Sequence, residues 1–155
     1  MYLNSVLVNV ENNTDYKFEW ELETNQILSN LRNYFSFNQD LEVDLVIINN
    51  EEIRELNKVH RGKDYATDVL SFDLGDSEIY AKLPFRHLGE LYISYEKILS
   101  QAEEFGHSPK REFCYLFTHG LVHLMGYDHE EESERKEMNK IVDEIFDPLK
   151  ITRES

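Results

Sequence analysis

The centre of this chain is a predicted helix and turn that read His119-Gly120-Leu121-Val122-His123-Leu124-Met125-Gly126-Tyr127-Asp128-His129. Ser108-Pro109 is typical of a helix start, and apolar residues recur after it at helical spacing. His119 and His123 are therefore expected at positions i and i+4 of one helix. Residues four apart have Cβ atoms about 5–6 Å from each other, so two imidazoles can bind one small cation.

A turn after this helix can supply a third ligand. Gly126 can adopt the left-handed conformation that ends a helix, which lets His129 return towards the other two histidines. The spacing matches that of metalloprotease zinc sites, except that Gly120 replaces the glutamate after the first histidine. We predict one catalytic Zn²⁺ bound by His119, His123 and His129, with an open position where the pKa of bound water falls to about 7. Nickel, copper or iron would accept the same ligands.

The composition indicates one globular domain spanning residues 1–155, with a core drawn from 41% apolar residues. No apolar run approaches the roughly 18 residues of a membrane span, and the N-terminus lacks the features of a signal peptide. The single Cys114 excludes an internal disulfide and is expected to pack among apolar helix residues. These features favour a cytoplasmic protein without a membrane partner.

The formal net charge of −15 argues against a protein that coats nucleic acid, because such proteins use Lys and Arg to displace counterions from phosphates. A polyanion would have to be bound by a local group of cations. DNA is not an expected partner. Arg86, Lys110 and Arg111 are candidates for such a rim.

The pattern of apolar residues predicts an α+β fold, a single domain with a mixed sheet of about four strands and about five helices. The metal site is expected at the end of a central helix. Asn49, Ser94 and Ser108 are expected to cap three of the helices. Strands are expected at 2–10, 41–48, 68–72 and 88–93, and helices at 19–35, 50–59, 95–105, from 109 towards Gly126, and from about 133 to 146.

The missing glutamate bears on the reaction, because Gly120 removes the proton acceptor that a zinc peptidase uses. A phosphodiester makes a different demand, since charge builds on nonbridging oxygens that a guanidinium can bind in pairs. We predict that Arg61 meets this demand from a loop spanning residues 60–67. The alternative is that Arg61 is a surface residue paired with Asp64 or Asp68.

Two stretches together resemble the YbeY family of bacterial rRNA maturation factors. The first runs Asn57-Lys58-Val59-His60-Arg61-Gly62-Lys63-Asp64-Tyr65-Ala66-Thr67-Asp68-Val69-Leu70-Ser71-Phe72 and is followed by Leu88-Gly89-Glu90-Leu91-Tyr92-Ile93-Ser94. The second is the stretch from His119 to His129. The chain differs from the common family pattern at His60, where an aromatic residue is frequent, and at Asp73, where proline is frequent.

This resemblance implies a cytoplasmic, zinc-dependent endoribonuclease specific for single strands, acting in small-subunit (16S) rRNA maturation and ribosome quality control. It implies that His119, His123 and His129 are metal ligands and that Arg61 is a functional arginine, so Arg61, His119 and His123 are the predicted catalytic residues. A small-subunit ribosomal protein and an Era-type GTPase are implied partners. His60, His87 and His107 are expected to be surface or packing residues.

Two other functions stay open on this evidence. One is a different metal-dependent hydrolase, such as a peptidase whose base comes from another position. The other is a ribosome-assembly binding factor in which zinc is structural. Asp128, Glu130 and Glu131 could orient a ligand or move a proton, although capping of the last helix explains them equally well. The attacking nucleophile is not determined by the sequence.

Overall fold

The computed structural model of the chain describes residues 5–73, 83–127 and 131–154. Within these ranges it contains five α-helices and four strands, which confirms the predicted α+β class. The elements in chain order are β1 (Val6–Asn12), α1 (Glu21–Tyr34), β2 (Asp40–Ile48), α2 (Asn50–Arg61), β3 (Val69–Asp73), β4 (Phe85–Ser94), α4 (Tyr95–Phe105), α5 (Pro109–Leu124), α6 (Glu132–Phe146) and the short 3₁₀ helix Asp147–Leu149.

The sheet is mixed, with strand order β1-β2-β4-β3. Strands β1, β2 and β4 are parallel, and β3 runs antiparallel to β4. Strand β4 begins at Phe85, three residues before the predicted start at Leu88, because Phe85, Arg86 and His87 pair with the first residues of β2. In the described ranges, no helix combines the length and the apolar character needed to cross a bilayer.

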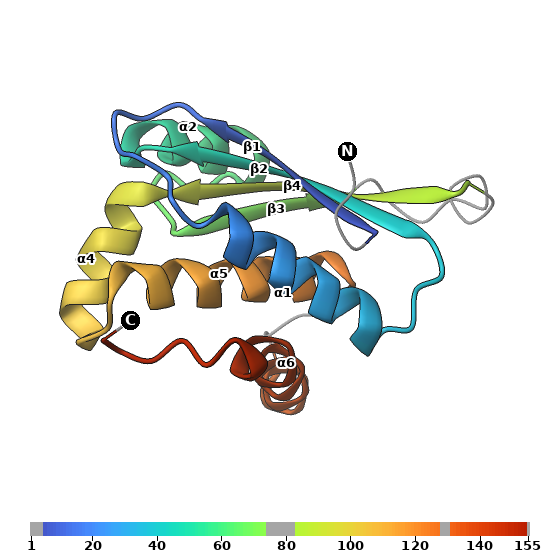
Figure 1. The fold of residues 1–155 in the computed structure, drawn as a ribbon. Helices are drawn as coiled ribbons and strands as arrows, with labels where there is room; N and C mark the ends of the chain where they lie inside the picture. The colour runs from blue at the N-terminus through green and yellow to red at the C-terminus, as the bar shows by residue number, and fades with distance from the viewer. Residues whose placement is uncertain (1–4, 74–82, 128–130, 155) are drawn as a thin grey trace.

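Helices cover the two faces of the sheet unequally (Figure 1). Helices α1 and α5 lie against one face and α6 packs beneath them, whereas α2 lies over part of the opposite face. Strand β2 shows both environments: Leu45 and Ile47 enter the large core, and Val46 and Ile48 enter a small core under α2. This double burial explains why the strand begins with alternating residues and ends as an apolar run.

The helix predicted to carry the histidines is the central helix α5. Ser108 caps it by accepting a hydrogen bond from the Arg111 backbone N–H at 3.1 Å, as its sequence predicted. Phe113, Phe117 and Leu121 on this helix are fully buried in the large core. The helix is therefore held along its length between the sheet and α6, which fixes the direction of the side chains on its remaining face.

Candidate metal centre and catalytic pocket

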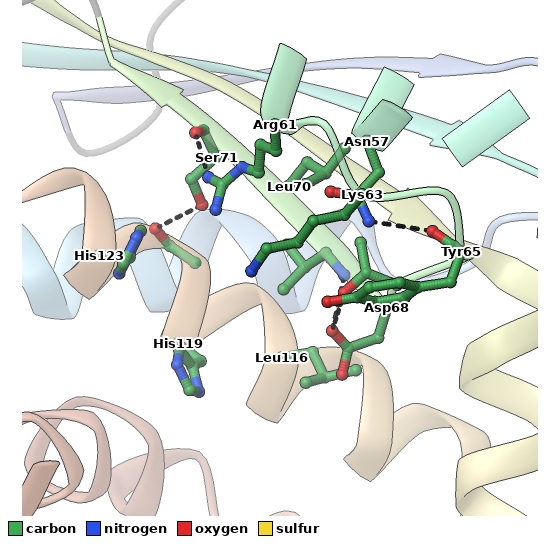
Figure 2. Close-up of a pocket in the computed structure, with 13 residues that line it drawn as sticks. Asn57, Arg61, Lys63, Tyr65, Asp68, Leu70, Ser71, Leu116, His119 and His123 are labelled. Carbon is green, nitrogen blue, oxygen red and sulfur yellow. Dashed lines mark hydrogen bonds between the residues drawn. The ribbon is translucent and has the colours of Figure 1, made fainter. Parts of the chain in front are cut away.

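His119 and His123 lie one turn apart near the C-terminal end of α5, as predicted. Both are partly exposed and line one cavity of about 300 Å³ (Figure 2). We call it the histidine cavity. Its lining consists of Asn57, Arg61, Lys63, Tyr65, Thr67, Asp68, Val69, Leu70, Ser71, Leu116, His119, Gly120 and His123.

Gly120 is where α5 touches the sheet. A Cβ at this position would lie 3.0 Å from Leu91 Cδ2 and 3.4 Å from Val69 Cγ2. Any side chain here would start inside the contact between the helix and strands β3 and β4. The position that carries the glutamate in zinc peptidases is thus a packing position in this chain, and a side chain there would start in the contact between α5 and the sheet.

The third predicted ligand, His129, lies outside the described residues, as do Asp128 and Glu130. Its role stays a prediction. The chain turns after α5, since Gly126 has φ +98° and its N–H donates to the His123 carbonyl at 3.0 Å. Among residues 5–73, 83–127 and 131–154, no three His, Cys, Asp or Glu side chains gather closely enough to hold an ion. His119 and His123 fit a metal as an i, i+4 pair of nitrogen donors.

Arg61 also lines the histidine cavity, but the prediction that it lies in a loop is wrong. Helix α2 continues through Arg61 and ends at Gly62, which takes the left-handed conformation with φ +68°. The helix continues because glycine can adopt that conformation without strain, so the residue before it can remain helical. The exposed Arg61 guanidinium donates from Nη2 to the Ser71 carbonyl at 3.5 Å, which directs it across β3 (Figure 2).

The segment after Arg61 is held at two points. The buried Asn57 donates from Nδ2 to the Tyr65 carbonyl at 2.9 Å, and Arg54 Nε donates to Asp64 at 2.8 Å. The hydrogen bond from Arg54 lowers the pKa of Asp64, and the charge of Arg54 acts in the same direction. The alternative interpretation paired Arg61 with Asp64 or Asp68, but Asp64 pairs with Arg54, and Asp68 accepts from Thr67, the Val69 N–H and Gln101. These contacts fix the backbone that carries Lys63 and Tyr65 on the cavity rim.

Asp68 is the carboxylate among the residues that line the histidine cavity. Its Oδ1 accepts from the Val69 backbone N–H at 2.8 Å and from the Thr67 hydroxyl at 3.4 Å. Its Oδ2 accepts from Gln101 Nε2 at 3.3 Å. Donors on both oxygens hold this side chain in one orientation within the wall of the cavity.

The predicted rim of Arg86, Lys110 and Arg111 is wrong for this cavity, because none of the three lines it. Lys110 pairs with Glu23 at 3.2 Å, while Arg86 and Arg111 lie over aromatic rings. Long cationic side chains bury their apolar stems against nearby rings, and the sequence does not predict which rings these are. Lys63 is the second cation at the cavity.

The other described histidines lie elsewhere. His60 packs edge-on against Phe72 with ring centroids 5.1 Å apart. His87 Nε2 lies 3.1 Å from Asp44, and His107 Nδ1 lies 3.6 Å from Glu112. These positions agree with surface or packing roles.

Sequence reasoning missed several residues of the cavity, chiefly Tyr65, Asp68 and Asn57. All three stand in the stretch 57–72, whose resemblance to a known family was recognised. The available signal was the order Arg61-Gly62-Lys63, in which a glycine allows the chain to reverse beside a cation. That signal indicates a turn but does not say which later side chains the turn brings to the cavity.

Comparison with known proteins gives a consistent result along the chain. The family model described as endoribonuclease YbeY matches residues 7–150. A relative from Mycoplasmopsis synoviae (strain 53), named endoribonuclease YbeY, is 50% identical over 153 residues, covering 99% of this chain and 99% of the relative. A relative of the same name from Mycoplasmopsis pulmonis (strain UAB CTIP) is 47% identical, covering 95% of this chain and 99% of the relative.

One solved structure supports the fold. The solution structure of TM1509 from Thermotoga maritima matches with a TM-score of 0.56 and 23% sequence identity. The match covers 92% of this chain and 91% of that protein. At this level of identity the likeness concerns the arrangement of helices and strands alone.

Proposed function

Since this chain belongs to the endoribonuclease YbeY family, we propose that it is a zinc-dependent endoribonuclease that cuts single-stranded RNA. We extend the proposal to maturation of small-subunit rRNA and ribosome quality control in the cytoplasm, with a small-subunit ribosomal protein and an Era-type GTPase as partners. The names of the relatives support the ribonuclease activity. The family resemblance alone supports the rRNA target, the location and the protein partners.

One observation carries the proposal. The histidine cavity combines two imidazoles from α5 with two cations, Arg61 at the end of α2 and Lys63 just after it, although α2 and α5 are distant in sequence. Imidazoles suit a metal ion, and a guanidinium suits the oxygens of a phosphate. In a chain with net charge −15, two cations at one cavity form the local attraction that a polyanionic substrate requires.

His119 and His123 would hold the zinc ion, together with the predicted ligand His129. When bound, the ion supplies Lewis acidity to a phosphoryl oxygen and lowers the pKa of coordinated water. The buried residues of α5 fix the two histidines before the substrate arrives. Such fixed groups reduce the reorganisation needed during the reaction.

Arg61 would bind the nonbridging oxygens of the phosphodiester. Its guanidinium can donate two parallel hydrogen bonds to one phosphate, and its donation to the Ser71 carbonyl orients the group. Lys63 would add a point charge on the same side. Both cations stabilise the charge that develops on the phosphoryl oxygens during cleavage.

Specificity for single strands is supported by Tyr65. Its side chain is 54% exposed and lies at the cavity on a backbone held by Asn57. An unpaired base can stack on an exposed aromatic ring, whereas a paired base keeps its faces within the duplex. The preference for single strands would therefore come from a ring fixed beside the reacting phosphate.

A peptidase is less well supported, because Gly120 occupies the position of the peptidase base and lies against Leu91. The assembly-factor alternative has no distinguishing feature among the described residues. Experiment distinguishes the two, since a binding factor would associate with RNA or a partner protein without cutting RNA.

The proposal is tested by measuring metal content and cleavage of a defined single-stranded RNA together. We expect the purified parent protein to contain about one zinc per chain and to cut the RNA, and His123→Ala to lose both. His60→Ala is the matched control, because His60 is exposed and does not line the cavity. The ends of the products identify the nucleophile: 2′,3′-cyclic phosphates indicate the RNA 2′-hydroxyl, and 5′-phosphates with 3′-hydroxyls indicate water.

A parent protein that binds zinc and leaves the RNA intact would contradict the enzyme proposal and favour the assembly factor. Cleavage that persists in His123→Ala at the parent rate would indicate a contaminating nuclease or a different site. Thermal unfolding of both variants shows whether the fold is retained.

A further inference from the structure

A second cavity of about 560 Å³ lies beside the histidine cavity. It is formed by α4, the connection to α5, the first half of α5, and parts of α6 and the C-terminal segment. We call it the Glu112 cavity, after one of the three carboxylates in its lining, the others being Asp68 and Asp143. Its volume is in the range of small-molecule sites and is large enough for a nucleobase.

The two cavities share a wall. Asp68 and Leu116 line both of them, and Leu116 stands one turn before His119 and Gly120 on α5. A ligand in the Glu112 cavity would therefore be separated from the histidine pair by a single layer of side chains. A strand of RNA with one phosphate at the histidine cavity has its neighbouring nucleotide within reach of this space.

A hydrogen-bond network connects three of the polar side chains in this lining, Gln101, Glu112 and Asp68. Gln101 Nε2 donates to Glu112 Oε2 at 3.0 Å and to Asp68 Oδ2 at 3.3 Å, so both hydrogens of its amide are used. His107 Nδ1 lies 3.6 Å from the other Glu112 oxygen. Gln101, Glu112 and Asp68 can therefore only accept further hydrogen bonds, through one amide oxygen and two carboxylates.

Glu112 is unusual for a charged residue, because it is only 6% exposed. Buried carboxylates are costly unless they are hydrogen-bonded, and here the contacts to Gln101 and His107 supply partners. The nearby Arg111 does not neutralise it directly, since its guanidinium donates to the Ile151 carbonyl and lies over the Phe146 ring. A ligand that brings N–H donors would satisfy the acceptors that remain.

Aromatic rings stand in the same lining. Phe105, at the end of α4, is 52% exposed, and the Tyr115 side chain lines the cavity from α5. An exposed phenyl ring offers a flat apolar surface for a base. Acceptors in the wall and a ring in the lining form the pair of features by which proteins bind unpaired bases.

On the basis of the ribonuclease function proposed above, we propose that the Glu112 cavity binds the base of a nucleotide next to the cleaved phosphodiester and prefers guanine. Guanine presents two adjacent donors, N1–H and the N2 amino group, which match the two oxygens of one carboxylate. Uracil presents one N–H between two carbonyl oxygens, and these oxygens would face the acceptors of Glu112 and Gln101. The arrangement therefore discriminates both by attraction and by repulsion.

The test uses single-stranded RNAs that differ only in the nucleotide on the 5′ or the 3′ side of the cleaved bond. For one of these sides we expect kcat/KM with guanosine to exceed that with uridine by about tenfold, the size of a good bidentate contact. Glu112→Gln should reduce this ratio below about twofold, because an amide presents one acceptor and one donor. Glu103→Gln, an exposed glutamate of α4 outside this lining, is the matched control and should keep the ratio.

Phe105→Ala provides a second variant that should keep the fold, because the side chain is exposed. It should raise KM for all of these RNAs by about tenfold through loss of stacking. Leu22→Ala, which removes another exposed apolar side chain, should leave KM unchanged. An unchanged guanosine-to-uridine ratio in a folded Glu112→Gln, or an unchanged KM in Phe105→Ala, would overturn the proposal.

Titration of the full chain with guanosine or uridine 5′-monophosphate, followed by amide NMR shifts, separates this inference from the ribonuclease function. If the parent cuts RNA without base preference, the inference fails and the ribonuclease function stands. If the parent cuts RNA without base preference and guanosine monophosphate binds in a Glu112-dependent way, the cavity binds a free nucleotide, and the proposal that it binds a base of the RNA substrate is overturned. If no RNA is cut, Glu112-dependent binding of guanosine monophosphate supports the guanine site, and absence of binding overturns it.

Discussion

Replacing Gly120 with glutamate would restore the residue that zinc peptidases carry at this position, and we expect it to destabilise the fold without creating a peptidase. The Cβ of any residue here would lie 3.0 Å from Leu91 Cδ2, and Leu91 is fully buried between the sheet and α5. The new side chain would start in this contact. Either the helix moves away from the sheet or the carboxylate remains buried.

The size of the effect follows from three contributions. Overpacking of a core costs about 1–3 kcal/mol, and a buried polar group without a partner costs about 1–3 kcal/mol. Replacing a glycine inside a helix returns at most about 1 kcal/mol. We therefore expect a net loss of about 1–5 kcal/mol in the free energy of unfolding. At about 2–4 °C per kcal/mol for a domain of this size, Tm should fall by about 2–20 °C.

The assay is thermal and urea unfolding of the parent, Gly120→Glu and Gly120→Ala, followed by circular dichroism. Gly120→Ala is the matched control: its single methyl group meets Leu91, but the helix gains propensity, so we expect a change within about 2 kcal/mol. A Gly120→Glu protein as stable as the parent would refute the packing argument. Zinc-dependent cleavage of a peptide by this variant would refute the view that the position faces the core.

Three further predictions concern the cavity and the core. Arg61→Ala should lower kcat on RNA by about 10²–10³-fold, because a donor that stabilises charge in the transition state is lost, while Tm and zinc content stay unchanged. Arg135→Ala, on the exposed face of α6, is the control. Equal kcat in both variants would remove Arg61 from the mechanism. Tyr65→Ala should raise KM for single-stranded RNA by about fivefold or more through loss of stacking, while Tyr65→Phe keeps the parent KM; a loss of the same size in Tyr65→Phe would indicate that the hydroxyl acts instead. Burial raises the pKa of the Cys114 thiol to about 12, so iodoacetamide at pH 8 should label it only after unfolding in urea, and rapid labelling of the native protein would contradict its place in the core.

Much of the local structure could be predicted because its causes lie within a few residues. The predicted caps Asn49, Ser94 and Ser108 each accept a hydrogen bond from the backbone N–H three residues later. The spacing of His119 and His123 places them one helical turn apart whatever the rest of the chain does. Helix ends were less certain, and α2 extends to Arg61 because Gly62 forms its C-cap.

The contacts between elements could not be predicted in this way. Arg86, Lys110 and Arg111 were candidates for a cationic rim, but none of them lines the histidine cavity, and they contact Phe37, Glu23 and Phe146. Each contact joins residues far apart in the sequence, and its geometry depends on how the chain packs around them. That packing cannot be read from the sequence alone.

From its residues alone, the chain specified an α+β domain, a central helix with two histidines on one face, and a glycine where a peptidase would have its base. Packing of α2 and α5 against opposite faces of the sheet added the other half of the site, since it brings Arg61 and Lys63 to the histidine cavity and turns Gly120 towards Leu91. The difference has a physical reason. Helical periodicity and capping are set by interactions over three or four residues, whereas a cavity forms where the side chains of distant elements meet, and its shape is fixed only when the whole core is packed.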